Sequence, residues 1–571
     1  MFSFSNLAVP LAFFLRLVQA AFSPITDCDE VFNYWEPLIY IIGYFHLLTP
    51  STFPIPIPIP IPIPIPIPIP AFQTWEYAKE YALRTYAFLT PLHLVSKSIL
   101  FSEVITLHEP LMFYGLRSVI AAFTAYTEVN YARALSTRLN SPTIFTFFLT
   151  FSILSPGMFH ASSAFLPSTI CMQLFLQSQT AYLENCRRKA IFWGMVCILA
   201  TGWPFVGVLF LPLGLECVLH AYNENGVKRA ISMILFAVVA ASATFVAVLG
   251  IDYAYYGRLV VPTFNIFMYN AIGNAESEGE GGTGDDLYGV EDWKFYIKNL
   301  LLNFNCILLL AGLMPFACIF GKNKNKNKND TKTLLTILAP GMLWVLLTFS
   351  RPHKEERFLF PVYPLICVAA SITMVKLCRN KFVVYVLLIL IGGLSESRKL
   401  ALHKYYFAPL SVYGELHGVI SSRGGQGGTV KVCVGGEWHR FPSHFFLPEN
   451  SALHFLKTGF GGQLPQHFGP GGSRETAMQS FNAMNREEEE RYEVGNIGEC
   501  DYVVVLETEG DEVLAQVEEA GVEFERIIEH DFLDAEKTSA LGRILYLPYI
   551  SDSYNVYAKY SVYERQAKIL E

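Results

Sequence analysis

Four carboxylates stand close together near the N-terminus, directly after the first apolar run. Within a stretch of ten residues, they are Asp27, Asp29, Glu30 and Glu36. Acidic groups at an apolar boundary lose hydration, which raises their pKa and makes a carboxylate a usable proton acceptor. The alternative is a surface loop whose aromatic residues anchor it at a membrane interface. We favour a functional cluster, because ionisable residues at membrane depth commonly serve function.

Cationic side chains gather in a short segment between two later apolar runs. In residues 351–357, the cationic candidates are His353, Lys354 and Arg357, and the acids are Glu355 and Glu356. A lipid phosphate is a natural counter-ion for such cations at a membrane surface. In the alternative, the two acids pair with Arg357 and Lys354 in an internal network. We favour a phosphate site, because two acids leave the local charge positive.

A third segment, residues 73–86, is rich in aromatic side chains. Its candidates for contact with a substrate are Trp75, Glu76, Arg84 and Tyr86. The aromatic rings could form an interfacial belt, which is the commoner explanation, or they could stack on sugar rings. Arg84 has no obvious partner nearby in the sequence, so we expect it to be a further candidate for binding a phosphate.

Membrane-spanning helices must position these candidates. Of the 571 residues, 52% are hydrophobic and 16% are charged, a balance that is wrong for a soluble multidomain protein. Apolar runs near the roughly 20 residues needed to cross a bilayer recur as far as about Leu394. The sequence therefore predicts a polytopic α-helical membrane protein with about eleven spans. The candidate spans are residues 2–22, 111–129, 142–155, 160–183, 190–203, 205–222, 229–251, 299–320, 333–350, 358–377 and 382–394.

The positions of Lys and Arg predict which loops share a side of the membrane. Clusters near residues 133–138, 187–189, 228–229, 322–332 and 376–381 all fall in loops of one parity, which are cytosolic by the positive-inside tendency. The remaining loops then face the lumen or the exterior. The large ones are 23–110 and 252–298, and the short one is 351–357. The carboxylates and the cationic segment are therefore expected on the same side.

The chain after about residue 400 changes character. It mixes β-like runs at 430–434, 502–506 and 543–547 with a helix-like stretch at 512–518. This alternation predicts a compact α/β domain over residues 401–571, following a membrane module over residues 1–400. An alternating Ile-Pro tract, residues 53–70, can form neither a helix nor a central strand. We expect it to be a stiff insertion in the first large loop, with no catalytic part.

Composition excludes some partners. With a net charge of -8 and no basic stripe, the chain is not expected to bind nucleic acid. The 11 cysteines show no paired metal-ligand spacing, so neither a zinc site nor a disulfide framework can be read from their positions.

Three segments resemble the motifs of glycosyltransferase family 22. They are residues 27–37, 72–86 and 353–364. Stretches of the tail at 432–442, 462–465 and 546–552 add to the resemblance, which covers nearly the whole chain, and the Ile-Pro tract is the main departure. The resemblance implies the C-type glycosyltransferase (GT-C) fold in a membrane enzyme that uses dolichyl-phosphate mannose.

The resemblance further implies an inverting alpha-1,2-mannosyltransferase, multi-pass in the endoplasmic reticulum membrane, with a luminal active site. The donor would be dolichyl-phosphate mannose, and the acceptor a dolichyl-diphosphate-linked oligomannose glycan destined for asparagine-linked glycosylation. Such a transfer needs a base for the acceptor hydroxyl and cationic groups for the departing phosphate, but no cofactor and no metal.

Residue roles follow from position in the family motifs. The catalytic base is expected at Asp29, with Glu30 beside it. The residues expected to bind the donor phosphate are His353, Lys354 and Arg357, with Arg84 as a weaker candidate. The residues expected to bind or orient substrate are Asp27, Glu36, Trp75, Glu76, Tyr86, Glu355 and Glu356.

Other functions remain open at this point. A mannosyltransferase of glycosylphosphatidylinositol anchors or an alpha-1,6-mannosyltransferase belongs to the same family, but the long tail and the Glu355-Glu356 pair argue against both. A transporter that binds a lipid phosphate is the non-enzyme alternative. Transporters commonly show internal repeats, and the sequence shows no convincing repeat.

Overall fold

The structure is a computed structural model of the chain. It describes residues 4–48, 70–100, 106–272, 289–320, 328–378, 380–423, 429–469, 472–474, 481–482 and 484–566. The Ile-Pro tract up to residue 69, the centre of the 252–298 loop and the basic stretch at 321–327 lie outside the described residues.

The chain divides into two compact units. The helical unit comprises Met1–Ala21, Arg117–Ile251 and Val261–Lys399. The loop-tail unit comprises Phe22–Leu116, Asp252–Val260 and Leu400–Glu571. The first large loop and the C-terminal tail therefore belong to one unit, although about 300 residues of the sequence separate them.

The apolar runs form helices, most of which match the expected spans. In chain order they are α1 (Phe4–Phe22), α5 (Pro110–Arg138), α6 (Pro142–Leu154), α7 (Pro156–Ala161), α8 (Pro167–Leu183), α9 (Arg187–Ala200), α10 (Gly207–Tyr256), α11 (Pro262–Ile272), α12 (Lys294–Gly312), α13 (Met314–Phe320), α14 (Lys328–Ser350), α15 (Tyr363–Leu377) and α16 (Lys381–Tyr406). Among the described residues, four helical stretches are long and apolar enough to cross a membrane: Pro204–Tyr256, Lys294–Phe320, Thr331–Ser350 and Glu356–Leu377.

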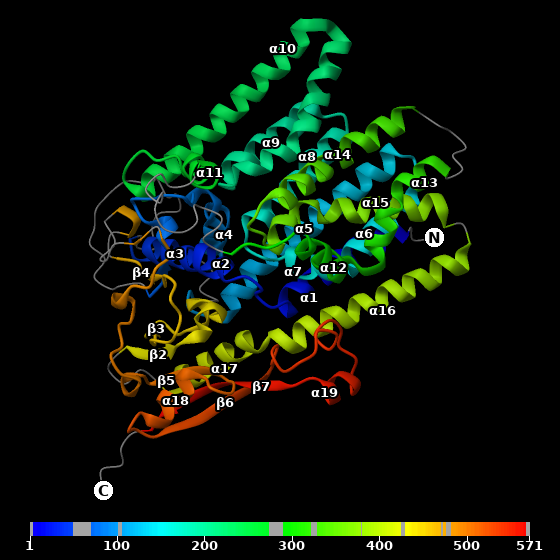
Figure 1. The fold of residues 1–571 in the computed structure, drawn as a ribbon. Helices are drawn as coiled ribbons and strands as arrows, with labels where there is room; N and C mark the ends of the chain where they lie inside the picture. Colours follow the sequence, from blue (N-terminus) through cyan, green and yellow to red (C-terminus); the bar gives the residue numbers. More distant parts are fainter. Residues whose placement is uncertain are drawn as a thin grey trace. The chain divides into compact units, whose positions relative to one another are not determined.

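Several of the expected spans do not correspond to one uninterrupted α-helix, for example 299–320, which is divided between α12 and α13. The span predicted over 160–183 is wrong as one helix, since α7 ends at Ala161 and α8 begins at Pro167. Proline lacks an N–H and restricts the residue before it, so it starts a helix more readily than it continues one. Helix α10 contains the two spans predicted over 205–222 and 229–251, and Figure 1 shows it turning back on itself.

The turn within α10 has a local cause. Asn225 and Gly226 leave the helical conformation there, and Gly226 adopts a φ of 64°, which favours glycine. Lys228 and Arg229 follow at once, so the reversal coincides with one of the basic clusters that the sequence placed on the cytosolic side.

A buried ion pair joins α1, α5 and α6 within the helical unit. The guanidinium of Arg16 donates to both carboxylate oxygens of Glu128, at 2.6 and 3.0 Å, and to Ser152 Oγ at 2.9 Å. Both charged side chains are fully buried. A charged residue inside an apolar helix bundle is tolerated only when such a partner compensates it.

The tail contains a five-stranded mixed sheet in the order β3-β2-β5-β7-β6 (Figure 1). The strands are β2 (Val430–Val434), β3 (Ser451–Phe455), β5 (Tyr502–Glu507), β6 (Phe524–Leu533) and β7 (Tyr557–Arg565). Strand β2 runs parallel to β3 and β5, whereas β7 runs antiparallel to β5 and β6. Helix α17 (Ala408–Arg423) packs on β6 and β7, and α18 (Glu512–Glu519) follows β5. The strands expected at 430–434 and 502–506 and the helix expected at 512–518 are confirmed.

The strand expected at 543–547 is wrong, because residues 543–544 form a turn and residues 545–547 have no regular secondary structure. Backbone carbonyls and side chains bond to this segment in place of a neighbouring strand. The hydroxyl of Tyr405 contacts the carbonyl oxygens of Gly542 and Leu545 at 3.2 and 3.1 Å. Apolar residues followed by a proline, here Pro548, are compatible with either a strand or an irregular segment, so the sequence did not distinguish between them.

A disulfide joins Cys433 and Cys500, although the spacing of the cysteines revealed no disulfide framework. Cys433 lies in β2, and Cys500 lies just before the neighbouring parallel strand β5. Strand pairing brings the two cysteines together, with their Cα atoms 5.9 Å apart. Nothing in their separation of 67 residues along the chain signals this contact.

The first large loop forms secondary structure of its own. It contains α2 (Cys28–Glu30), a π-helical turn at Val31–Trp35, α3 (Glu36–Leu48), β1 (Phe72–Gln73) and α4 (Thr90–Leu100). Strand β1 pairs antiparallel with β4 (Gln466–His467) of the tail. This small sheet is one of the connections that hold the loop and the tail in one unit.

Candidate active site

The predicted base Asp29 lies in the short helix α2 at the start of the first large loop. Asp27 caps this helix, because its carboxylate accepts a hydrogen bond from the backbone N–H of Asp29 at 3.0 Å. The side chains of Asp27 and Asp29 are half-buried. Asp27 therefore serves to position Asp29, and both carboxylates keep some access to solvent.

Glu30 has a different environment from its neighbour. Its side chain is buried, and its carboxylate accepts a hydrogen bond from the indole N–H of Trp35 at 3.0 Å. Trp35 is itself fully buried against Phe113, with the ring centroids 4.9 Å apart. Of the two acids predicted for catalysis, Asp29 is thus the more accessible one.

Glu36, predicted to contact substrate, is fully buried inside the loop-tail unit. Its carboxylate accepts hydrogen bonds from the backbone N–H of Phe72 at 2.9 Å and of His444 at 2.8 Å. It also contacts His444 Nδ1 at 2.7 Å. These bonds connect α3, β1 and the tail, so the structure gives Glu36 a structural role in place of the predicted contact.

Arg84 has partners close to it, and the expectation that it lacks one is wrong. Its guanidinium donates to Glu76 Oε1 at 2.7 Å and to Tyr34 Oη at 2.8 Å. Glu76 stands eight residues earlier in a segment that folds back, which is why no helical or strand spacing revealed the pair. Two predicted site residues, Arg84 and Glu76, therefore do meet.

The aromatic candidates near Arg84 differ in exposure. Trp75 is half-buried and contacts Tyr81 edge to face, with the centroids 5.1 Å apart. Tyr86 is buried, stacks on Tyr255 at 4.4 Å and shares a hydrogen bond of 2.6 Å with Ser473. Burial raises the pKa of Tyr86 well above its usual value. Tyr86 thus stays protonated and contributes packing, whereas Trp75 remains a candidate for sugar contact.

Asp252 is a buried acid that the sequence reasoning missed. Its carboxylate accepts hydrogen bonds from Thr85 Oγ1 at 2.8 and 3.0 Å and from the backbone N–H of Tyr86 at 2.8 Å. It lies near the end of α10 and holds the segment that carries Arg84. The sequence signal that could have identified Asp252 is its position directly after a long apolar run.

The short segment 351–357 is internally bonded. Glu355 lies between two of the predicted phosphate ligands, at 3.0 Å from His353 Nε2 and in direct contact with the guanidinium of Arg357. Lys354 is buried, and its ammonium donates to the backbone carbonyls of Arg351 and Pro352. The alternative of an internal network is thus correct for Glu355 and Arg357, and Lys354 shapes the turn.

Glu356 belongs to a separate cluster. It does not pair with Lys354; its Oε1 contacts His160 Nε2 at 2.6 Å and accepts from Asn303 Nδ2 at 2.8 Å. Asn303 also donates to Tyr363 Oη at 3.1 Å. His160, from α7, and Asn303, from α12, were missed because no motif marked them.

A glycine permits this cluster to form. A Cβ added to Gly157 in α7 would lie 2.9 Å from Asn303 Cβ and 2.9 Å from a ring carbon of Tyr363. Such contacts are too short for a side chain. Gly157 therefore allows α7, with His160, to approach α12 and the segment that carries Glu356.

The residues around the predicted base could also be considered as cation ligands. Asp27, Cys28 and Asp29 offer three ligand atoms within 4.8 Å of one another. They are consecutive in the chain, however, so adjacency alone brings them together. This group gives no independent sign of a metal.

The chain matches a known family over most of its length. The family model described as the Alg9-like mannosyltransferase family matches residues 7–49 and 69–448. The chain is 34% identical to "Alpha-1,2-mannosyltransferase ALG9" of Mus musculus, covering 97% of this chain and 88% of that protein. It is 31% identical to "Alpha-1,2-mannosyltransferase ALG9" of Saccharomyces cerevisiae, over 94% of this chain and 91% of that protein.

One solved structure has a similar fold. It is the crystal structure of ArnT from Cupriavidus metallidurans bound to undecaprenyl phosphate, with a TM-score of 0.52 and 10% sequence identity. The likeness covers 80% of this chain and 86% of that chain. At this identity the likeness concerns the fold alone.

Proposed function

This chain belongs to the Alg9-like mannosyltransferase family, and from that premise we propose that it transfers mannose from dolichyl-phosphate mannose to a dolichyl-diphosphate-linked oligomannose acceptor. The new bond is an alpha-1,2 linkage, as in the names of the relatives. The membrane part has the GT-C fold, in keeping with its likeness to a solved structure that was determined with a lipid phosphate. The match over nearly the whole chain is the observation that carries the proposal.

The proposed transfer is a single displacement with inversion. The acceptor hydroxyl attacks the anomeric carbon of mannose while the bond from that carbon to the phosphate oxygen breaks. The proton of the hydroxyl passes to the carboxylate of Asp29, and dolichyl phosphate leaves. The half-buried position of Asp29 and its fixed backbone, capped by Asp27, support this role.

The departing phosphate needs positive charge near it. We assign this role to His353 and Arg357, which Glu355 orients. Lys354 keeps the turn in shape through its bonds to backbone carbonyls. Arg84, held by Glu76 and Tyr34, is the second candidate for contact with a phosphate.

The proposed location is the lumen of the endoplasmic reticulum. The disulfide between Cys433 and Cys500 supports it, because disulfides persist in oxidising compartments. The distribution of Lys and Arg over the loops also favours a non-cytosolic tail. In this proposal the catalytic membrane module spans residues 1–400, and the luminal α/β domain spans 401–571.

A membrane assay with labelled dolichyl-phosphate mannose and defined lipid-linked acceptors tests this proposal. Asp29→Asn should abolish mannose transfer without changing the protein level, because an amide cannot accept the hydroxyl proton. Glu80→Gln is the matched control, since Glu80 is an exposed acid of the same loop, and it should retain full transfer.

Two outcomes would count against the proposal in different ways. Near-normal transfer by Asp29→Asn would remove Asp29 as the base and leave the activity standing. If the unaltered protein transferred mannose only to glycosylphosphatidylinositol precursors, or formed only alpha-1,6 bonds, the proposed acceptor would be wrong.

A further inference from the structure

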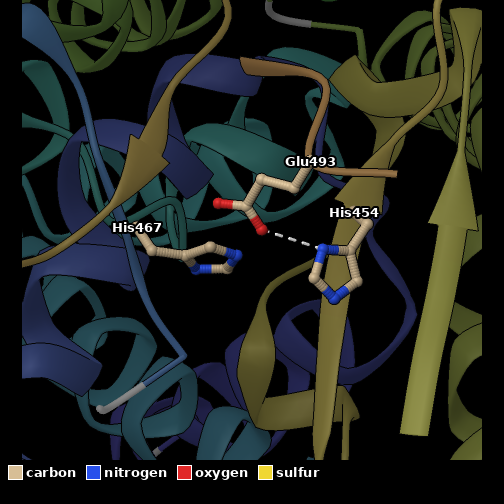
Figure 2. A group of neighbouring side chains, drawn as sticks. All are labelled: His454, His467 and Glu493. Carbon is tan, nitrogen blue, oxygen red and sulfur yellow. Dashed lines mark hydrogen bonds and ion pairs between the residues drawn. The ribbon is translucent and has the colours of Figure 1, made fainter. Parts of the chain in front are cut away.

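Three potential metal ligands meet in the tail, and none of them is among the residues assigned to mannose transfer. His454 lies in β3, His467 lies in β4, and Glu493 lies in the segment that leads toward β5. One ligand atom from each residue lies within 4.8 Å of the other two. Figure 2 shows the three side chains turned toward one another. Unlike three consecutive residues, these come from separate segments that the fold has to bring together.

The His467 ring is held in place by residues of the first large loop. Its ring stacks on Phe72 of β1 with the centroids 4.4 Å apart, and the two residues are also partners in the β1–β4 ladder. Its Nδ1 is buried and has no hydrogen-bond partner among the described residues. In Figure 2 the other ring nitrogen, Nε2, is the one turned toward Glu493, so Nε2 is the nitrogen placed to bind an ion.

The other two ligands are also fixed by their surroundings. His454 stands opposite Cys433 in the parallel pair of β3 and β2, and its Nδ1 lies 3.0 Å from Glu493 Oε2. Glu493 is followed by Val494, which is buried in a hydrophobic core with Cys433. The position of each ligand is thus set by a strand or by a core residue.

The segment of Glu493 is also tied to the strand of His467. The guanidinium of Arg491 bonds to Gln466 of β4 and to Glu488. Because Arg491 precedes Glu493 by two residues and Gln466 precedes His467 by one, this bond holds the two ligand-bearing segments side by side.

The donor set favours a particular class of ion. Two imidazole nitrogens and one carboxylate oxygen suit zinc and related divalent transition metals, whereas calcium and magnesium prefer oxygen ligands alone. Metal bonds of about 2.0–2.1 Å in a tetrahedron separate neighbouring ligand atoms by roughly 3.3 Å. The observed His454–Glu493 distance of 3.0 Å is close to that value, and the ligand atom of His467 lies within 4.8 Å of both.

We propose that His454, His467 and Glu493 bind one divalent transition-metal ion, with zinc as the favoured ion, which links β3 and β4 of the tail. Since β4 pairs with β1, the ion also strengthens the connection between the tail and the first large loop. The fourth position is left for water. This role is structural and does not depend on mannose transfer.

The test uses the purified full-length protein in detergent, first dialysed against a chelator and then titrated with Zn²⁺. We expect one ion per chain by elemental analysis, and a rise in Tm when Zn²⁺ is added. His467→Ala, His454→Ala and Glu493→Gln should each weaken Zn²⁺ binding by more than about tenfold, because altering a direct ligand costs at least as much as altering its outer partners.

His530→Ala is the matched control. His530 is a tail histidine that contacts a single carboxylate, Glu415, at 2.7 Å, so its loss should leave Zn²⁺ binding unchanged. Glu493→Gln preserves side-chain size and serves if an alanine variant fails to fold. Its Tm in chelator should equal that of the unaltered protein, while its Tm should no longer respond to Zn²⁺.

The proposal is overturned if the unaltered protein binds no Zn²⁺, or if Glu493→Gln binds it with unchanged affinity. A His454–Glu493 ion pair without a metal would give such a result. Cobalt substitution gives a separate check, because tetrahedral Co²⁺ has a strong visible absorption band. This band should be present in the unaltered protein and absent in His467→Ala.

Discussion

Glu355 orients His353 and Arg357, the two side chains proposed to bind the phosphate. Its two carboxylate oxygens contact two different side chains, His353 on one side and Arg357 on the other. The guanidinium is planar, so a bond to its Nε fixes the direction of the remaining donors. Cations that are ordered before a ligand arrives lose less entropy on binding it. The internal bonds of this segment are therefore compatible with a phosphate site and can improve it.

Arg357→Ala tests this arrangement at the level of the donor. Removing the guanidinium should raise the KM for dolichyl-phosphate mannose by about tenfold or more, since a charge-assisted bond to phosphate contributes about 1.5–3 kcal/mol. The KM for the acceptor should change little. Initial rates at varied donor and acceptor concentrations measure both quantities.

Arg357→Lys and Lys294→Ala complete the experiment. Lysine keeps the charge but lacks the planar fork, so Arg357→Lys should recover only part of the donor affinity. Lys294 is exposed and forms an ion pair with Asp292 at 3.5 Å, so Lys294→Ala should leave the donor KM unchanged. An unchanged donor KM in Arg357→Ala would show that this segment does not bind the phosphate.

Helix α1 depends on one ion pair for its place in the helical unit. Arg16 stands among apolar residues and would be costly in an apolar environment without Glu128 and Ser152. The pair is fully buried, and it fixes which face of α1 meets α5 and α6. The hydropathy of the segment predicted a helix at 2–22, but it contained no information on this rotation.

Arg16→Met should destabilise the helical unit strongly. Removing one partner leaves Glu128 as a buried charge without its cation, which costs about 3–5 kcal/mol in comparable cases. The double variant Arg16→Met with Glu128→Gln removes both charges and should recover a large part of the lost stability. Tm values measured in detergent for the single and double variants give the comparison.

Arg229→Met is the control for the loss of a surface ion pair. Arg229 and Glu224 are both exposed and lie 3.3 Å apart, and pairs of this kind contribute about 0–1 kcal/mol. Its Tm should stay close to that of the unaltered protein. If Arg16→Met were equally mild, the buried pair would not be what orients α1.

At the scale of the whole molecule, local signals were predictable and long-range pairings were not. The sequence predicted Val430–Val434 as a strand and most apolar runs as helices, because each follows from periodicity within a short window. The Cys433–Cys500 disulfide and the Glu36–His444 contact join segments far apart in the chain. Only the completed fold determines such contacts, so composition and spacing could not reveal them.

The candidate site shows the same difference between local features, which could be predicted, and long-range contacts, which could not. Motifs identified Asp29 and the segment of Arg357 from residue type alone, whereas the supporting residues carried no motif. His160, Asn303 and Asp252 each act through a carboxylate contact that forms in three dimensions. The sequence therefore indicated candidate residues, but it did not indicate the contacts that orient them.

The stability of the whole molecule should depend on pH through the buried histidine His93 in α4. Burial, with a smaller contribution from the nearby charge of Lys97, lowers the pKa of His93 to about 4. Its pKa in an unfolded chain is about 6.5. Between these values the unfolded state binds more protons than the folded state, so the free energy of unfolding falls as the pH decreases from about 6.5 toward 4. At pH 5 the loss is about 2 kcal/mol by this linkage.

His93→Gln removes the titrating group while keeping a polar side chain of similar size. We expect the variant to lose some Tm at pH 7.5 through altered packing, and to lose less Tm than the unaltered protein when the pH is lowered to 5. The quantity to compare is therefore the change in Tm between the two pH values, measured for both proteins in the same detergent. Equal changes would mean that His93 takes up its proton in the folded protein as readily as in the unfolded chain, and that burial of α4 does not hold this imidazole neutral.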